Sequence, residues 1–207
     1  MWLLFLSYIQ NKSNKASNQV TNQPNMFHLA STRFNTATLS QNMSYREKNN
    51  KAAIYGTIIK IHRKITIGSF LFIIEMNNEE NKIEGISLIK NSLVLEKKHK
   101  IYENEDYNHY IYGGDYWISR QQILQHNSSI AEIFDKILFK GKTHLKRACG
   151  ITVLNESLFI NWKQNIAFWK EEIRQLFIKI FEIEMMETIR ERGEEILEEE
   201  QKEQAML

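Results

Sequence analysis

The pattern of apolar and polar positions divides the chain into three parts. Residues 7–50 are rich in Asn, Ser, Thr and Gln and show no sustained periodicity, which is typical of segments that bury too little apolar surface to fold. We therefore expect a disordered leader over residues 1–44, an ordered domain over residues 45–155 and a long helix over residues 156–207. Met43 fits a native start, with the residues before it as an upstream extension.

Strands dominate the first half of the expected domain. Apolar, β-branched runs predict strands over residues 54–61 and 70–76, the second of them buried on both faces. The polar run 77–81 predicts a hairpin connection into a partner strand over residues 82–89, where Gly85 marks a bulge or a close approach. Shorter strands are expected over residues 93–95, 100–102, 107–112, 116–118 and 148–154.

Helical spacing follows in the second half. Ser119 is a suitable N-cap for a helix over residues 120–126, and a second helix is expected over residues 129–139, ending at Gly141. A long helix is expected from about residue 156 to 200, because its apolar residues alternate steps of three and four. This stripe comprises Ile166, Trp169, Ile173, Leu176, Ile180 and Ile183.

Together these elements predict an α+β fold: a small twisted or barrel-like, mostly antiparallel sheet with two short helices and a long C-terminal helix. One cysteine in 207 residues excludes an internal disulfide and every Cys-rich zinc pattern. Cys149 is expected to be a small buried residue, and the location intracellular, in a reducing compartment. No apolar run is long enough to span a bilayer, so no membrane partner is expected.

Charge is unevenly distributed. The chain carries 27 basic and 25 acidic side chains, and the net charge of +2 is too small to indicate a nucleic-acid partner by itself. Residues 163–207, however, carry seven basic and 12 acidic groups, so an acidic end follows a mildly basic body.

A basic loop over residues 140–147 is the strongest local feature. Glycine lets backbone amides approach a ligand, and Lys and Arg neutralise phosphate, so the loop is a candidate polyanion site. Its candidate residues are Lys140, Lys142, His144, Lys146 and Arg147. Gly141-Lys142-Thr143 is not a P-loop, since the preceding glycine is replaced by Lys136 and a helix stands where a strand is needed. The alternative is a solvated basic loop without a ligand.

Aromatic residues cluster around Gly113 and Gly114. Aromatics beside cations can stack on nucleobases, so Tyr112, Tyr116 and Trp117 are candidate base contacts. The alternative is that they pack a small sheet core. Asp115 and Arg120 flank the cluster and can pair with each other.

Catalytic chemistry has little support. His144 is the best candidate for proton transfer, with Glu75 or Asp115, and Glu75 with Glu84 is the one candidate carboxylate pair. No complete catalytic set is visible. The remaining histidines lack ligand spacing, so neither a metal site nor a cofactor is expected.

Residues 45–154 resemble a family of uncharacterised proteins of large nucleocytoplasmic DNA viruses and related genomes. The resemblance rests on Phe72-Ile73-Ile74-Glu75-Met76-Asn77-Asn78, on Asn81-Lys82-Ile83-Glu84-Gly85-Ile86, and on residues 140–147 followed by Gly150-Ile151-Thr152. It covers roughly half of the chain. It implies a viral context, in host cytoplasm, nucleus or virion, and no activity. Ala148 stands where the pattern has glycine, which puts a tight backbone approach there in doubt.

A looser likeness, at the level of the fold, links residues 53–90 to PUA-like and EVE-like barrels. Three functional hypotheses follow. The first is a nucleic-acid-binding module, for RNA or DNA, that uses the basic loop and the aromatic cluster. The second is a non-catalytic interaction or virion-associated protein whose C-terminal helix binds a partner or a second copy. The third, an enzyme built on His144, ranks last.

Overall fold

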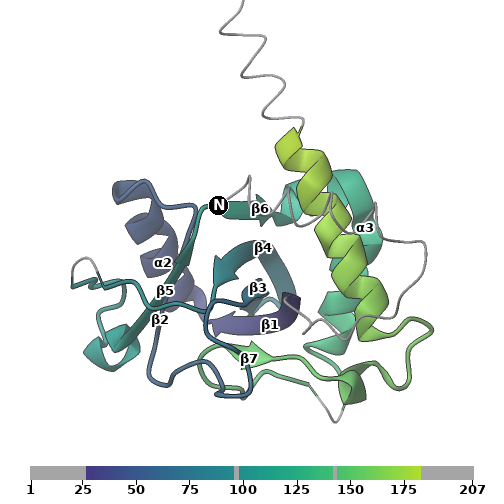
Figure 1. Cartoon of the computed structure of the whole chain (residues 1–207), viewed down its shortest axis with the longest axis horizontal. Coiled ribbons are helices and arrows are strands. Elements are labelled where there is room, and N and C mark those ends of the chain that lie inside the picture. The colour runs from purple at the N-terminus through teal and green to yellow at the C-terminus, as the bar shows by residue number, and fades with distance from the viewer. Residues whose placement is uncertain (1–26, 96–97, 142–143, 183–207) are drawn as a thin grey trace, which may run out of the picture.

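The computed structural model describes residues 27–95, 98–141 and 144–182. These residues form an α+β fold with a mixed five-stranded sheet and a separate two-stranded sheet (Figure 1). The elements in chain order are β1 (Phe27–Phe34), α2 (Thr36–Lys48), β2 (Ala53–Thr57), β3 (Phe70–Asn77), β4 (Lys82–Lys90), β5 (Tyr110–Gly114), β6 (Tyr116–Ser119), α3 (Arg120–Ile137) and β7 (Thr152–Val153). A further helix covers residues 166–182.

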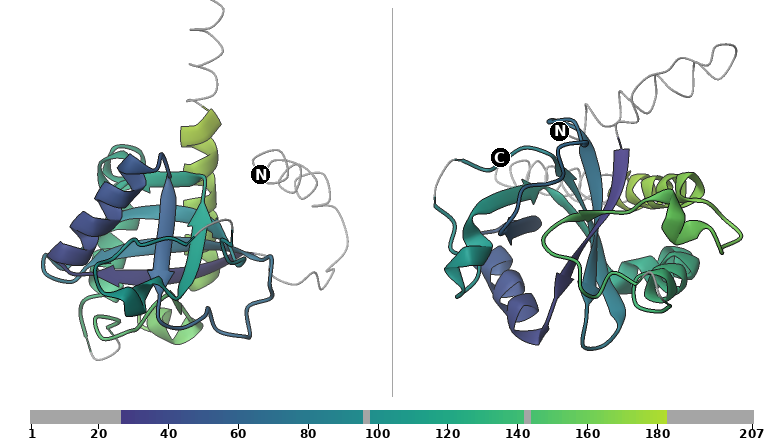
Figure 2. Two further views of the ribbon diagram at one scale, coloured as in Figure 1. Left: turned by 90° about the vertical axis from the view of Figure 1, so that its left-hand side faces the viewer. Right: turned by 90° about the horizontal axis from the view of Figure 1, so that it is seen from below.

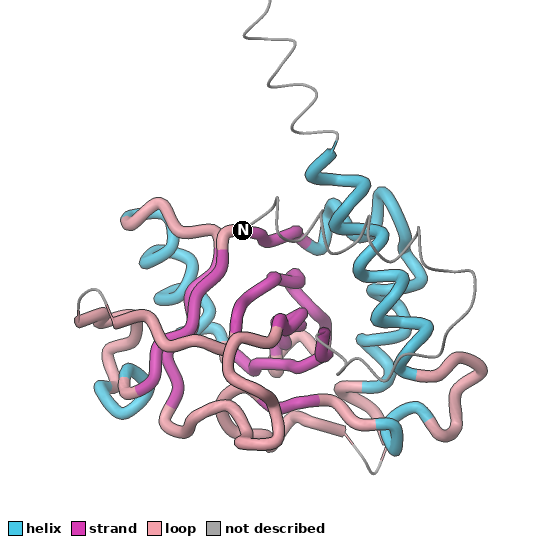
Figure 3. Tube along the Cα trace, in the orientation of Figure 1, coloured by secondary structure: helices cyan, strands magenta, loops and turns pink. Residues whose placement is uncertain are grey.

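The five-stranded sheet has the order β6-β4-β3-β1-β7. Its central pair, β1 and β3, runs parallel, while the other three neighbouring pairs are antiparallel. β2 pairs with β5 in the second sheet. In the described residues the sheet ends at β6 and β7, which do not pair with each other, so it is not a closed barrel and the prediction is confirmed only as an α+β fold. Figure 3 distinguishes the strands, helices and loops along the chain trace.

The molecule has layers on both faces of the five-stranded sheet. α2 and the β2–β5 pair lie on one side, and α3 with helix 166–182 lies on the other (Figures 1 and 2). Each side has its own core, because successive side chains of a strand point to opposite faces. β3 is buried along its whole length, as its unbroken apolar run predicted.

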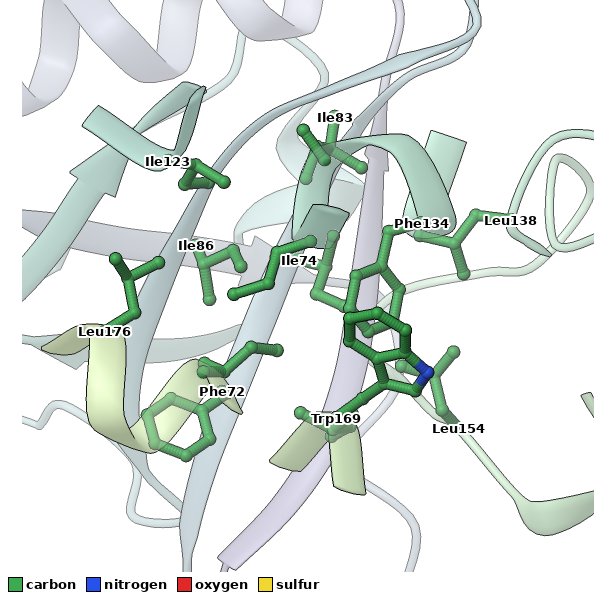
Figure 4. Close-up of a cluster of buried hydrophobic side chains, with 14 of the residues drawn as sticks. Phe72, Ile74, Ile83, Ile86, Ile123, Phe134, Leu138, Leu154, Trp169 and Leu176 are labelled. Carbon is green, nitrogen blue, oxygen red and sulfur yellow. The ribbon is translucent and has the colours of Figure 1, made fainter. Parts of the chain in front are cut away.

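The first core cluster lies between the sheet and the two helices. Phe72 and Ile74 of β3 face Phe134 of α3 and Trp169 of helix 166–182 (Figure 4). The predicted stripe of helix 166–182 is buried here: Ile166, Trp169, Ile173, Leu176 and Ile180 are each 7% exposed or less. The sixth stripe position, Ile183, lies outside the described residues.

The second core cluster lies on the opposite face. Leu71 and Ile73 of β3 pack there with Tyr55 of β2 and Tyr112 of β5. In the described part of the chain, no helix is long and apolar enough to cross a membrane.

The predicted disordered leader is wrong for residues 27–44. β1 is a central strand of the sheet, and α2 begins at Thr36 with a capping box between Asn35 and Thr38. Apolar periodicity missed both elements because β1 buries Ser31 and Thr32, and the residues that α2 buries are polar. Residues 1–26 lie outside the described part of the chain.

Other local predictions are confirmed. The 70–76 and 82–89 strands, with their hairpin, appear as β3 and β4, and the register shifts between Glu75 and Met76 opposite Gly85. Ser119 caps α3 through the backbone N–H of Gln122. The two predicted helices after it form one element with a kink at Asn127, whose φ of −158° is not helical.

Further expectations are wrong. Residues 100–102 form no strand, residues 93–95 contribute only an isolated bridge between Leu93 and Tyr112, and the strand expected over residues 54–61 ends at Thr57. The helix predicted from residue 156 begins at residue 166, after a short 3-10 helix over Glu156–Phe159. Arg120 pairs with Asp135, at 2.7 Å between Nη2 and Oδ2, and not with Asp115. Cys149 is exposed rather than buried.

Candidate nucleic-acid interface

A buried carboxylate organises the polar interior. Glu75 is 1% exposed, and its Oε1 accepts hydrogen bonds from Arg46 Nη1 at 3.0 Å and from the Tyr55 hydroxyl at 2.5 Å. Its Oε2 accepts one from Trp117 Nε1 at 2.9 Å, and the Tyr55 hydroxyl also lies 2.8 Å from Ser87 Oγ. We call Arg46, Tyr55, Glu75, Ser87 and Trp117 the glutamate network.

Gly85 makes this arrangement possible. A Cβ on Gly85 would lie 2.6 Å from Trp117 Nε1, so only glycine lets the indole cross β4 to reach Glu75. The Arg46 guanidinium stacks on the same indole, 4.4 Å from the ring centroid. The close approach predicted at Gly85 is therefore confirmed.

The geometry of the glutamate network indicates a structural role. Both oxygens of Glu75 are engaged and the group is sealed from solvent, so it offers no acceptor to a substrate. Burial, followed by the charge of Glu75, raises the pKa of the Tyr55 hydroxyl well above its usual value, which keeps it a neutral donor. The carboxylate pair expected from Glu75 and Glu84 is wrong, because Glu84 accepts instead from Asn77 Nδ2 at 2.7 Å.

The aromatic cluster is dispersed by the fold. The chain leaves the two-stranded sheet at the end of β5 and joins the five-stranded sheet at β6. Tyr112 is 2% exposed in the second core cluster, Tyr116 packs edge-on against Phe181, and Trp117 belongs to the glutamate network. Gly114 marks the crossing, since a Cβ there would lie 2.1 Å from the Leu88 carbonyl oxygen.

These contacts favour the alternative, that the three aromatic residues pack the core, over a role of Tyr112, Tyr116 or Trp117 in contacting a base. Tyr112 is buried, and its hydroxyl accepts a hydrogen bond from the Ile61 backbone N–H at 3.1 Å. The three aromatic residues are close together in the sequence, but each side chain contacts a different part of the structure. The alternative reading of them, as core residues, describes their positions better.

The basic loop is held against the turn between β3 and β4. Lys146 Nζ donates to Asn81 Oδ1 at 2.7 Å, and the Lys146 carbonyl accepts from Asn78 Nδ2 at 2.9 Å. Lys140 and Arg147 are exposed, and His144 is half-buried, with its Nδ1 3.3 Å from the Lys146 backbone N. The predicted site residue Lys142 lies outside the described residues.

A second basic loop, over residues 58–66, lies close to the segment that follows residues 140–147. Residues 58–66 follow β2 and carry Lys60, Arg63 and Lys64, all exposed. A Cβ on Gly150 would lie 3.3 Å from Ile59 Cγ1 and 3.5 Å from Thr57 Cβ, so the second loop contacts the segment that directly follows residues 140–147. Gly150 has φ of +62°, a conformation that favours glycine at this contact.

Neither of the two loops contains an acidic residue. The sequence has no Asp or Glu over residues 57–69 or over residues 136–155. Arg33, at the end of β1, joins them by donating from Nε to the Ala148 carbonyl. We call Arg33, Lys60, Arg63, Lys64, Lys140, Lys146 and Arg147 the basic surface. None of these seven side chains forms an ion pair within residues 27–95, 98–141 and 144–182.

A cleft of about 90 Å³ opens between the loops at the start of α2. We call it the α2 cleft; it is lined by Thr32, Arg33, Phe34, Asn35, Thr38, Gly56, Thr57, Ile58, Tyr102, Tyr107, Cys149 and Gly150. This lining contains one cation and no acidic residue. The concave part of the basic surface is therefore suited to an anion.

A larger groove of about 350 Å³ lies elsewhere, between α2 and residues 100–103. It is lined by Lys48 and Lys100 but also by Glu103, and Lys100 pairs with Glu105 at 3.5 Å. Unlike the α2 cleft, it has an acidic residue in its lining, and removal of its two cations therefore provides an internal control.

Sequence reasoning found the 140–147 loop but missed its partners. Arg33 was assigned to the leader, and residues 58–61 to a continuing strand. The signal that could have found them is the acid-free run over residues 57–69, which is readable in the sequence. The contact between the two loops was not readable, since it depends on how β7 is placed beside β1.

Comparisons with protein families, curated proteins and solved structures found no match to this chain. The function is therefore argued from the geometry alone.

Proposed function

We propose that the chain binds the phosphate backbone of a nucleic-acid strand along the basic surface. The observation that carries the proposal is the contact between two acid-free loops through Gly150 and residues 57–59. Seven cations without ion pairs in the described chain lie on or beside these segments, and one of them, Arg33, lines the α2 cleft. Phosphate contacts from Lys and Arg supply most of the affinity in such complexes, independently of base sequence.

The absence of acidic neighbours in the sequence supports the proposal. Elsewhere in the described residues, Arg46, Lys82, Lys100, Arg120 and Arg174 each pair with a carboxylate, while other lysines such as Lys48 and Lys90 do not, so the distinguishing feature of the basic surface is the acid-free sequence around its cations. A basic side chain that lacks a carboxylate partner is available to neutralise a ligand's phosphate. The base-stacking part of the earlier hypothesis is withdrawn, because Tyr112, Tyr116 and Trp117 are engaged in the fold.

The rival function, partner binding through the apolar stripe of the C-terminal helix, loses its main support. Within residues 166–182 the stripe is already covered by the sheet and α3. A catalytic role for His144 is not supported either, because Glu75, one of its two expected partners, is hydrogen-bonded to Arg46, Tyr55 and Trp117 instead.

The test is binding of short fluorescent RNA and DNA strands, followed by anisotropy. Replacing Arg63 and Lys64 together by Gln should weaken binding roughly 10–30-fold at about 0.1 M salt, if each cation contacts one phosphate. The matched control removes two cations from the larger groove, Lys48→Gln with Lys100→Gln, and should change affinity little. Absence of binding at low salt, or equal losses in both variants, contradicts the proposal.

A further inference from the structure

Tyr110 is an aromatic residue beside the basic surface that the core does not fully cover. It is the first residue of β5 and pairs with Thr57, the last residue of β2 before the loop over residues 58–66. Tyr110 is half-buried, whereas Tyr112, two positions further along the same strand, is 2% exposed. Tyr110 therefore leaves part of its surface to solvent at the base of a basic loop.

Lys60 lies over the ring of Tyr110. Its Nζ is 5.2 Å from the ring centroid, which is within the range of a cation–π contact. Lys60 is exposed and belongs to the basic surface, and a cation–π contact at an exposed position is weak. A phosphate can therefore draw the ammonium group away from the ring and leave the ring face to a second group. The pair places a phosphate contact directly beside a flat aromatic surface.

Apolar side chains are exposed on the same loop. Ile61 and Ile65 are only 7% and 8% exposed, and the Ile65 carbonyl accepts a hydrogen bond from Asn91 Nδ2 at 3.0 Å, so the loop is anchored to the core. Three of the eight large apolar residues that are exposed in the described chain nevertheless fall within residues 58–67: Ile58, Ile59 and Ile67. Apolar surface among cations suits a ligand that is both anionic and apolar.

This combination of cations, an aromatic ring and apolar side chains favours an unpaired strand over a duplex. In a duplex the base faces stack on one another, and a protein meets the phosphates and the base edges. In a single strand the bases can turn outward and stack on an aromatic side chain while cations bind the phosphates beside them. Lys60 and Tyr110 are the two side chains that such a nucleotide requires.

We propose that the protein binds single-stranded nucleic acid, with Tyr110 stacked on one base and Lys60 bound to the neighbouring phosphate. The inference rests on the proposed function and deepens it, because it names an unpaired strand as the ligand. Ile59, which is 51% exposed, adds an apolar contact to the adjoining nucleotide. A duplex hides its base faces and meets the cations alone.

The first experiment compares three ligands of equal length at one salt concentration, with binding followed by fluorescence anisotropy. The ligands are a single strand, the duplex that it forms with its complement, and an abasic strand that keeps the sugars and phosphates. The single strand should bind about tenfold tighter than the abasic strand, which is the gain expected from stacking one base on an aromatic side chain. It should also bind more tightly than the duplex.

The second experiment replaces Tyr110. Tyr110→Leu removes the ring and should weaken binding of the single strand about tenfold, while binding of the abasic strand, which also reports that the variant is folded, should not change. The slope of log K against log salt should stay the same, because the ring contacts no phosphate. Tyr110→Phe is the matched control, since it keeps the ring and should bind as the parent does.

Three results overturn the inference. Equal binding of the single strand and the abasic strand by the parent, with the Arg63→Gln/Lys64→Gln variant still weakened, rejects base stacking and leaves the proposed function intact. Binding of the duplex as tight as that of the single strand, or tighter, rejects the preference for an unpaired strand. Failure of every ligand to bind at low salt rejects both the inference and the proposed function.

Discussion

The glutamate network and the basic surface differ in whether their charges are paired within the described chain. In the network, one buried carboxylate is matched by Arg46 and by two neutral donors, and the ion pair is 10% and 1% exposed at its two side chains. The basic surface has seven cations without an ion pair in the described chain, and the lining of the α2 cleft, which includes Arg33, has no acidic residue. The charges of the first arrangement are balanced within the described chain, and those of the second are not.

This difference separates residues that stabilise the fold from residues that we propose to bind a ligand. Removing one member of a buried ion pair leaves an uncompensated charge and is strongly destabilising. Removing an exposed cation changes stability little but weakens any phosphate contact it makes. Each region therefore predicts a different measured loss, which makes the comparison testable.

The largest effect is expected from deleting residues 1–42. The deletion removes β1, the parallel neighbour of β3, and half of the helix that carries Arg46. We expect loss of the cooperative thermal transition followed by circular dichroism. A chain that begins at residue 27 keeps β1 and α2 and should retain a cooperative transition. A cooperative transition in the chain that begins at Met43 would contradict the placement of β1.

Breaking the glutamate network should have the next largest effect. Arg46→Met leaves Glu75 buried without its cation and should lower the free energy of unfolding by about 3–5 kcal/mol. The double variant Arg46→Met/Glu75→Leu should recover part of the loss, since neither charge remains. Urea denaturation measures both. A loss for Arg46→Met of less than about 1 kcal/mol would mean that the pair is solvated.

The same measurement on the basic surface gives a smaller effect. Arg63→Met and Lys64→Met replace exposed cations without an acidic partner in the described chain, so each should change the free energy of unfolding by less than about 0.5 kcal/mol. A loss comparable to that of Arg46→Met would show that the loop over residues 58–66 is a structural element rather than a binding surface.

The smallest effect concerns His28 of β1. Burial, and then the charge of Lys170, lowers the pKa of His28 below its ordinary value of 6.5. The unfolded chain then takes up a proton at a higher pH than the folded chain, so stability is lost as the pH falls through about 6.5. Thermal melts at pH 7.5 and 5.5 should show a larger decrease for the parent than for His28→Gln. An equal decrease would contradict this assignment.

Sequence patterns predicted the elements whose burial is apolar. β3, β4, the Ser119 cap and the buried stripe of helix 166–182 follow from periodicity and capping chemistry. β1 and α2 were not predicted, because polar side chains hold them in place. α2 is held by Asn42, which donates to the Ile54 carbonyl at 2.7 Å, and by Arg46. Such anchors depend on partners far away in the sequence.

Only the part of the candidate site that depends on local sequence could be predicted. The charge of the 140–147 loop is a local property, and it was found. The dispersal of Tyr112, Tyr116 and Trp117 depends on a change of sheet at Gly114, and the addition of Arg33 and the 58–66 loop depends on tertiary contacts. Clustering in the sequence was therefore a poor guide to clustering in space.

The central claim is that the two basic loops form one phosphate-binding surface. Its most direct test is the salt dependence of strand binding for four proteins: the parent, Arg63→Gln/Lys64→Gln, Lys146→Gln/Arg147→Gln, and the combination of all four substitutions. Each phosphate contact on a single strand contributes about 0.7 to the slope of log K against log salt. The account predicts slopes flattened by about 1.4 in each double variant and by about 2.8 in the combination. A parent slope that only the 146–147 substitutions change, or that neither pair changes, would contradict it.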